Sequence, residues 1–138
     1  MKYVFATILL LIPSFIMAEG ISVPYGIGGP HATFDPVIAQ YNRSGERFRI
    51  EGQCKSSCVM FLGIRNVCVD RNASLLFHGA NDNSHTIRPW LNNHLLSHFN
   101  DKLRAYLVSN RILETLDFHT ISGVDMIEKF GYPECPNR

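Results

Sequence analysis

The chain has 138 residues, of which 46% are hydrophobic, and its formal net charge is +1 at pH 7. This length allows one compact core and excludes two, and the hydrophobic content excludes an intrinsically disordered chain. The near-zero charge excludes a protein built to bind nucleic acid, because such a protein needs a basic surface to displace counterions.

The N-terminus resembles a secretory signal segment. Lys2 precedes an apolar run, Val4–Ala18, which ends just before Glu19. The run is too short to span a bilayer comfortably, and no second apolar block follows it. We predict that residues 1–18 are a cleaved signal peptide and that 19–138 form a single exported domain with no stable membrane insertion. A retained N-terminal anchor is the alternative.

The first half of the mature chain alternates between strand and helix patterns. Residues 21–25 predict a short strand, which a glycine-rich turn at 26–30 closes. Apolar residues spaced i, i+3, i+4 and i+7 predict a helix over 34–41. Strict apolar–polar alternation predicts a strand over 47–51, and the apolar stretch 59–64 predicts a buried helix.

Two further strands, over 67–69 and 73–77, precede a mainly helical C-terminal half. One apolar stripe predicts a long amphipathic helix over 89–108, and shorter helices are predicted over 112–118 and 124–130. Strands and helices that alternate in such short units are typical of the α/β class. We therefore expect a small α/β fold, with a mixed, mostly parallel sheet covered by helices.

The predicted mature chain contains four cysteines: Cys54, Cys58, Cys68 and Cys135. In an exported protein, an even number of cysteines favours disulfides, here two. Zinc is the competing use, but it normally needs two closely spaced pairs, and only one pair is close here. Three pairings are open. We favour Cys58 with Cys68, because the buried helix and the next strand are neighbours in sequence, and this leaves Cys54 with Cys135.

The turn before the buried helix carries two serines, Ser56 and Ser57. A serine hydroxyl becomes a nucleophile only beside a base and beside fixed N–H donors. A helix N-terminus supplies such donors, and a histidine, His78, ends the strand over 73–77, at the edge of the sheet where ligands usually bind. Ordinary structural roles compete with this interpretation: a helix cap for a serine, and a strand-end cap for the histidine.

Two other histidines, His94 and His98, are spaced i, i+4 in the long predicted helix, as in some zinc sites. Leu95, however, stands where a metalloprotease keeps its glutamate, and the helical period turns His94 away from the apolar stripe. We therefore predict two solvated surface histidines, no metal site and no cofactor.

In their order along the chain, these motifs resemble the proteolytic subunit of Clp protease and its crotonase-superfamily relatives. That family has a Gly-Gly turn, then a serine-bearing turn before a buried helix, then a strand that ends in histidine. The matching segments fall within residues 20–80 and are Gly28-Gly29, Gly52-Gln53-Cys54-Lys55-Ser56 and Ser74-Leu75-Leu76-Phe77-His78. The chain is also similar to a group of exported bacterial proteins with a Cys-x-Ser-x-Cys turn, a Val-Cys-Val strand and a Phe-His motif.

The resemblance implies a role for each matching residue. Ser56 matches the nucleophile and His78 matches the general base. The backbone N–H groups of Gly29 and Ser57 match the oxyanion hole, which stabilises the charge that develops on the substrate carbonyl.

The family's acid, which orients the base, precedes a helix that residues 122–126 resemble. It is therefore expected near Asp117, with Glu114 as the fallback. The chain is short for this family and shows no helical extension of the kind through which Clp rings assemble. We do not expect a processive ring, and whether the protein forms a homo-oligomer is left undecided by the sequence.

The expected protein is an exported serine hydrolase of the periplasm or the extracellular medium. In particular, we expect a peptidase that acts on a peptide or protein substrate through an acyl-enzyme. The alternative is a non-catalytic periplasmic module that keeps a Clp-like fold for binding.

Overall fold

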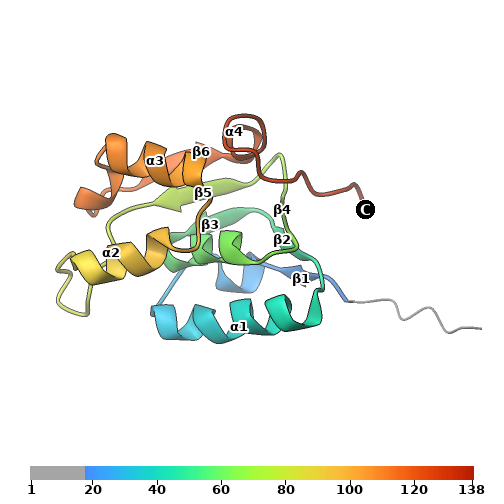
Figure 1. Cartoon of the computed structure of the whole chain (residues 1–138), viewed down its shortest axis with the longest axis horizontal. Coiled ribbons are helices and arrows are strands. Elements are labelled where there is room, and N and C mark those ends of the chain that lie inside the picture. The colour runs from blue at the N-terminus through green and yellow to red at the C-terminus, as the bar shows by residue number, and fades with distance from the viewer. Residues whose placement is uncertain (1–17) are drawn as a thin grey trace, which may run out of the picture.

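The computed structural model describes residues 18–138, and Figure 1 shows their arrangement. The predicted signal peptide, except for Ala18, lies outside the described residues. Short strands form the centre of the protein. Helix α1 (His31–Ser44) lies on one side of them, and α3 (Asp101–Ser109) and α4 (Gly123–Glu128) lie on the other side (Figure 1).

The first of two small sheets is entirely parallel. It consists of β1 (Gly20–Ile21), β2 (Phe48–Ile50) and β4 (Val67–Val69), in the order β1-β2-β4. Parallel neighbours need a crossover connection, and α1 provides it between β1 and β2. Every residue of β2 and β4 is buried, so this sheet forms part of the interior.

The second sheet is mixed. It consists of β3 (Gln53–Lys55), β5 (Ser74–Phe77) and β6 (His119–Ser122), in the order β3-β5-β6. The pair β3–β5 is parallel and the pair β5–β6 is antiparallel. The predicted α/β class is thus confirmed, with mostly parallel pairing. The strands are divided between two sheets, however, and the sequence patterns predicted neither β3 nor β6.

Three 3-10 helices accompany these elements in the described chain: η1 (Val23–Tyr25), η2 (Ser56–Gly63) and η3 (Ile112–Glu114). η2 is central, because every residue from 57 to 62 is buried. Apolar side chains of both sheets and of the helices join η2 in one continuous core. The prediction of a buried helix is therefore correct, although this helix is of the 3-10 type and begins at Ser56.

The long helix predicted over 89–108 is two helices, α2 (Pro89–Leu96) and α3. The break occurs because Asn100 caps a new helix: its Oδ1 accepts a hydrogen bond from the N–H of Leu103 at 3.0 Å. The apolar stripe continues across the break, since Leu95, Phe99 and Leu103 are all buried. Hydrophobic periodicity alone therefore could not reveal it.

Other boundaries differ near the N-terminus. The strand predicted over 21–25 is only β1, and Pro24 follows within η1, because proline cannot donate to a strand ladder. The helix predicted over 34–41 is longer than expected and begins at His31. This earlier start adds a histidine to the first turn of α1.

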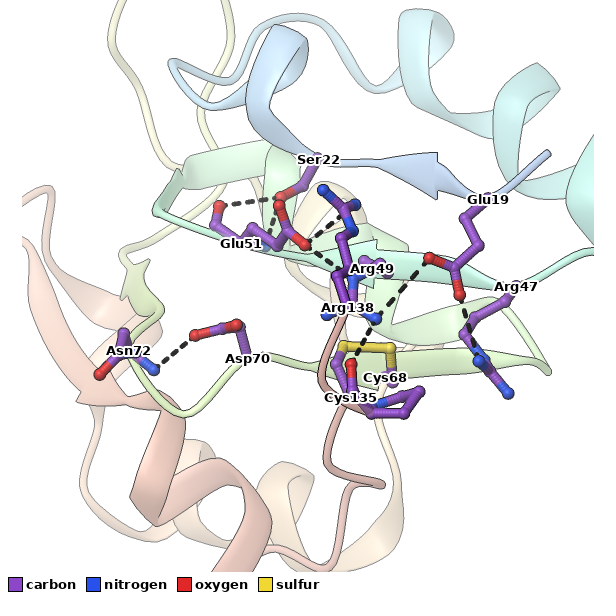
Figure 2. Close-up of polar contacts among 11 residues, drawn as sticks. Glu19, Ser22, Arg47, Arg49, Glu51, Cys68, Asp70, Asn72, Cys135 and Arg138 are labelled. Atoms are coloured by element: carbon purple, nitrogen blue, oxygen red, sulfur yellow. Dashed lines mark hydrogen bonds and ion pairs between the residues drawn. A yellow bond between two sulfur atoms is a disulfide. The ribbon is translucent and has the colours of Figure 1, made fainter.

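All four cysteines form disulfides, as predicted, but the favoured pairing is wrong. The bonds are Cys54–Cys58 and Cys68–Cys135. The C-terminal segment runs beside β4, where the N–H of Cys135 donates to the carbonyl of Val69 at 3.0 Å, and this brings Cys135 next to Cys68 (Figure 2). Cys54 and Cys58 lie at the two sides of the β3–η2 junction, within one turn of each other.

A buried arginine also holds the C-terminal segment. Arg49 of β2 is 3% exposed, and it donates to Glu51 Oε1 at 2.7 Å and to the carbonyl of Pro136 at 3.0 Å. Arg138 forms a further ion pair with Glu51 at 3.2 Å (Figure 2). Because a buried charge is costly unless it is paired, these contacts explain why an arginine is tolerated in an interior strand.

Among residues 18–138, no helix combines the length and the apolar character that a membrane crossing requires.

Candidate active site

A pocket of about 1040 Å³ opens where several distant segments of the chain meet. Its walls come from the glycine turn before α1, the starts of α1 and η2, the end of β5, the loop at 80–85 and α2. The residues in its lining whose polar groups could take part in a reaction or in binding include Gly29, Asp35, Ser56, Ser57, His78 and His94. The serine and the histidine singled out from the sequence therefore line one pocket.

Ser56 has an unusual backbone conformation at the start of η2. Its φ is +54°, which only a few non-glycine residues adopt. Gly28 makes room for it, because a Cβ on Gly28 would lie 2.8 Å from the Cβ of Ser56. Backbone strain of this kind is found preferentially at functional sites, where the surrounding structure maintains it. Here the disulfide Cys54–Cys58 spans the strained residue.

Gly29 and Ser57 carry the two N–H groups that were predicted to form an oxyanion hole, and both residues line the pocket. The first N–H groups of a helix have no acceptor within the helix, and Ser57 occupies such a position in η2. The hydroxyl of Ser57 donates a hydrogen bond to the carbonyl of Gly29 at 2.5 Å. This bond attaches the glycine turn to η2 and fixes one segment against the other.

His78 immediately follows β5 and enters the pocket from the second sheet. Its Nδ1 atom is buried and has no hydrogen-bond partner within the described part of the chain. The ring of Phe118 packs edge-on against the imidazole, with 5.0 Å between the ring centroids. Burial lowers the pKa of His78, and the backbone of Gly79 opposes this effect only in part. The neutral ring, which can accept a proton, therefore predominates at neutral pH.

The structure does not bring the predicted acid to His78. Asp117 is exposed and lies outside the residues that line the pocket. Glu114 is exposed as well, and its carboxylate pairs with Arg111 at 2.6 Å. The aromatic ring of Phe118, the residue after Asp117, packs against the imidazole instead. Of the three catalytic residues expected from the sequence, Ser56 and His78 line the pocket and Asp117 does not.

The prediction of two solvated surface histidines in the long helix is wrong for His98, whereas the side chain of His94 is 37% exposed. His94 lines the pocket, and its Nε2 atom lies 3.0 Å from Oδ1 of Asp35 in α1. The side chain of His98 is only 14% exposed, and its Nε2 atom lies 3.7 Å from the same oxygen. Burial, followed by the charge of His94, lowers the pKa of His98. Sequence reasoning missed Asp35 because it lies 59 residues before His94, and no local pattern links the two.

Apolar side chains complete the pocket wall. Val59, Leu91 and Trp90 line it, and the indole of Trp90 is 67% exposed at the rim. Asp82, which also lines the pocket, organises the loop at 80–85 by accepting hydrogen bonds from the backbone of Ser84 and from the side chain of Arg88. The pocket thus combines polar and apolar side chains, a combination typical of sites that bind organic ligands.

Comparison with known proteins gives no relative: no protein-family model, no curated protein and no solved structure matches this chain.

Proposed function

We propose that this α/β protein is an exported serine hydrolase in which Ser56 is the nucleophile and His78 the general base. One observation carries the proposal: a serine with positive φ at a helix start lines the same pocket as a half-buried, neutral histidine that follows the neighbouring strand β5. A buried helix start, a disulfide and a close glycine hold the serine in place. The two disulfides support export to the periplasm or the extracellular medium.

In the proposed reaction, His78 takes the proton of the Ser56 hydroxyl as the oxygen attacks a carbonyl carbon. The N–H groups of Gly29 and Ser57 stabilise the oxyanion, and His78 returns the proton to the leaving group. Water then hydrolyses the acyl-enzyme by the same route. A serine–histidine pair without its acid keeps part of the catalytic rate, because the base and the oxyanion donors act without it.

A peptide or protein is the proposed substrate, and the protein is then a peptidase with a Clp-like or crotonase-like arrangement. The pocket supports this choice by its volume and by the apolar side chains of Val59, Leu91 and Trp90, which suit a side chain of a bound peptide. The exposed indole at the rim offers a further apolar contact for such a chain.

A fluorophosphonate probe, which reacts with activated serines, tests the proposal on the oxidised protein. We expect labelling of the wild type, none of Ser56→Ala and a strong decrease in His78→Gln. Ser84→Ala is the matched control, since Ser84 is exposed in the loop near the pocket and should not affect labelling. Labelling that persists in Ser56→Ala would assign the reactive group elsewhere and contradict the proposal.

A non-catalytic binding module is the second candidate. The observation that favours it is the missing acid: Asp117 and Glu114 lie outside the pocket lining, and Nδ1 of His78 has no hydrogen-bond partner in the described chain. Folded, oxidised protein that the probe does not label at all would favour this candidate over the hydrolase.

A further inference from the structure

Three metal-ligating side chains converge at the pocket that the proposed catalytic residues line, and two of the three, Asp35 and His94, belong to its lining. Asp35, His94 and His98 each offer one ligand atom, and all these atoms lie within 4.8 Å of one another. The first comes from α1, the second from α2 and the third from the turn after α2. Two imidazoles and a carboxylate are the ligand set of several zinc enzymes.

The separations suit a metal ion better than they suit hydrogen bonding alone. Ligand atoms at zinc bond lengths in a tetrahedron lie about 3.3–3.5 Å from one another. The Oδ1 atom of Asp35 lies 3.0 Å from Nε2 of His94 and 3.7 Å from Nε2 of His98. The first distance is a hydrogen bond, but the second is too long for one and needs only a small adjustment to fit an ion.

Two further observations indicate that His98 is positioned to bind. Its Nε2 atom is buried and has no hydrogen-bond partner among residues 18–138, which is costly unless a ligand satisfies it. Its Nδ1 edge packs against Gly63, where a Cβ would lie 2.7 Å from Nδ1. Gly63 therefore allows the ring to lie close to η2 with Nε2 near Asp35.

A fourth group lies next to the three. His31, one turn before Asp35 on α1, packs against His94 with 5.3 Å between the ring centroids, and its Nδ1 atom is also buried without a partner within the described chain. The cysteines cannot compete for a metal, because in the described chain all of them are oxidised. Nitrogen and oxygen ligands from α1, α2 and the turn after α2 are thus the groups available for an ion here.

We propose that Asp35, His94 and His98 bind a divalent transition-metal ion, with zinc the best match to this ligand set. Since Asp35 and His94 line the pocket, the ion has a coordination position that faces it. The ion also connects α1 to α2 across the pocket mouth. This proposal does not depend on Ser56, so each of the two proposals can fail without the other.

Zinc binding by the oxidised protein tests the site directly. After treatment with a chelator, the protein is loaded with Zn²⁺, dialysed against metal-free buffer and analysed for metal, and its thermal unfolding is followed. We expect one zinc ion per chain and a higher melting temperature with zinc, because an ion that binds only the folded state stabilises it. Cobalt in place of zinc should give the visible absorption of a low-symmetry, four- or five-coordinate site.

Variants separate this site from adventitious binding. Asp35→Asn keeps the size of the side chain and removes its charge, and His94→Gln removes an imidazole; each should weaken zinc binding by at least about tenfold, the effect of losing even an outer-shell partner. His85→Asn is the matched control, since His85 is an exposed histidine that lines the same pocket. Ser56→Ala should also bind zinc normally. The proposal is overturned if the wild type retains no zinc, or if Asp35→Asn and His94→Gln bind it as tightly as the control.

Discussion

Ser56 and His78 each have an energetically unfavourable feature at the candidate site, backbone strain for Ser56 and desolvation for His78. The positive φ of Ser56 turns the chain sharply between β3 and η2. This conformation is sterically possible because the neighbouring Gly28 has no side chain that would collide with Ser56. On the other side of the pocket, the half-buried imidazole of His78 loses water contacts that would favour its charged form. Strain at one residue and desolvation at the other are both costs to folding, and such costs are commonly found at functional sites.

The lowered pKa of His78 gives a prediction on pH. The base must be neutral to accept the proton of Ser56, and burial shifts the equilibrium towards the neutral ring. The rate of fluorophosphonate labelling should therefore still be above half of its maximum at the ordinary histidine pKa of about 6.5, and it should be half-maximal only below that value. A series of labelling rates between pH 5 and 8, on protein whose folding is checked at each pH, measures this. A midpoint at or above the ordinary value would contradict the assignment of His78 as a desolvated base.

At the level of elements, the break between α2 and α3 shapes the part of the pocket that Asp35 and His94 line. It ends α2 shortly after His94, and the following turn directs His98 back towards Asp35. Asn100 maintains the break: besides capping α3, its Nδ2 donates to the carbonyl of Phe130 at 2.8 Å, and its N–H donates to the hydroxyl of Tyr132 at 3.0 Å. One asparagine thus ends a turn, starts a helix and attaches both to the C-terminal region.

Replacement of this cap should be costly. Asn100→Ala removes the bond to Leu103 and the bond to Phe130, so we expect the free energy of unfolding to fall by about 1–2 kcal/mol. Asn93→Ala is the matched control, because Asn93 is exposed within α2, where alanine is the better helix former. Urea denaturation of both variants measures the difference. Equal stability of the two variants would show that the cap contributes little.

At the level of the whole molecule, the two disulfides differ in what they connect. Cys54–Cys58 closes a local turn of sequence separation 4, next to Ser56. Cys68–Cys135 joins β4 to the C-terminal segment across a separation of 67, and Arg49 supports the same connection through Pro136. All four cysteines are buried, so the size of the closed loop is the main difference between the two bonds.

Loop size predicts how much each disulfide stabilises the fold. In the chain-entropy description, the long loop contributes about 4 kcal/mol and the short one about 2 kcal/mol. We expect the Cys68→Ala/Cys135→Ala double variant to lose clearly more stability than Cys54→Ala/Cys58→Ala, when both are compared with the oxidised wild type in urea. The reverse order would mean that local strain at the β3–η2 turn outweighs the entropy of the long loop.

Much of the fold could be predicted because its information is local. The strands β4 and β5, the burial of η2 and the apolar stripe of α2 and α3 follow from hydrophobic patterns within a few residues. Ser56 and His78 stand at the ends of recognisable elements, but the order of the motifs and the family resemblance selected them, and their catalytic roles stay a prediction. β6 was missed because His119–Ser122 is short and lies between helical patterns, and only its pairing with β5 makes it a strand.

The amino-acid sequence was sufficient for the α/β class and for the oxidation of all four cysteines, since composition and short-range periodicity carry these properties. The choice of Ser56 and His78, which depends on the family resemblance of the motifs, stays a prediction. Three results came from the folded chain alone: the pairing of Cys68 with Cys135, the lack of a hydrogen-bond partner for Nδ1 of His78 among residues 18–138, and the meeting of Asp35 with His94 and His98. Each depends on residues far apart along the chain. Their proximity arises from the packing of whole elements, which no local pattern specifies.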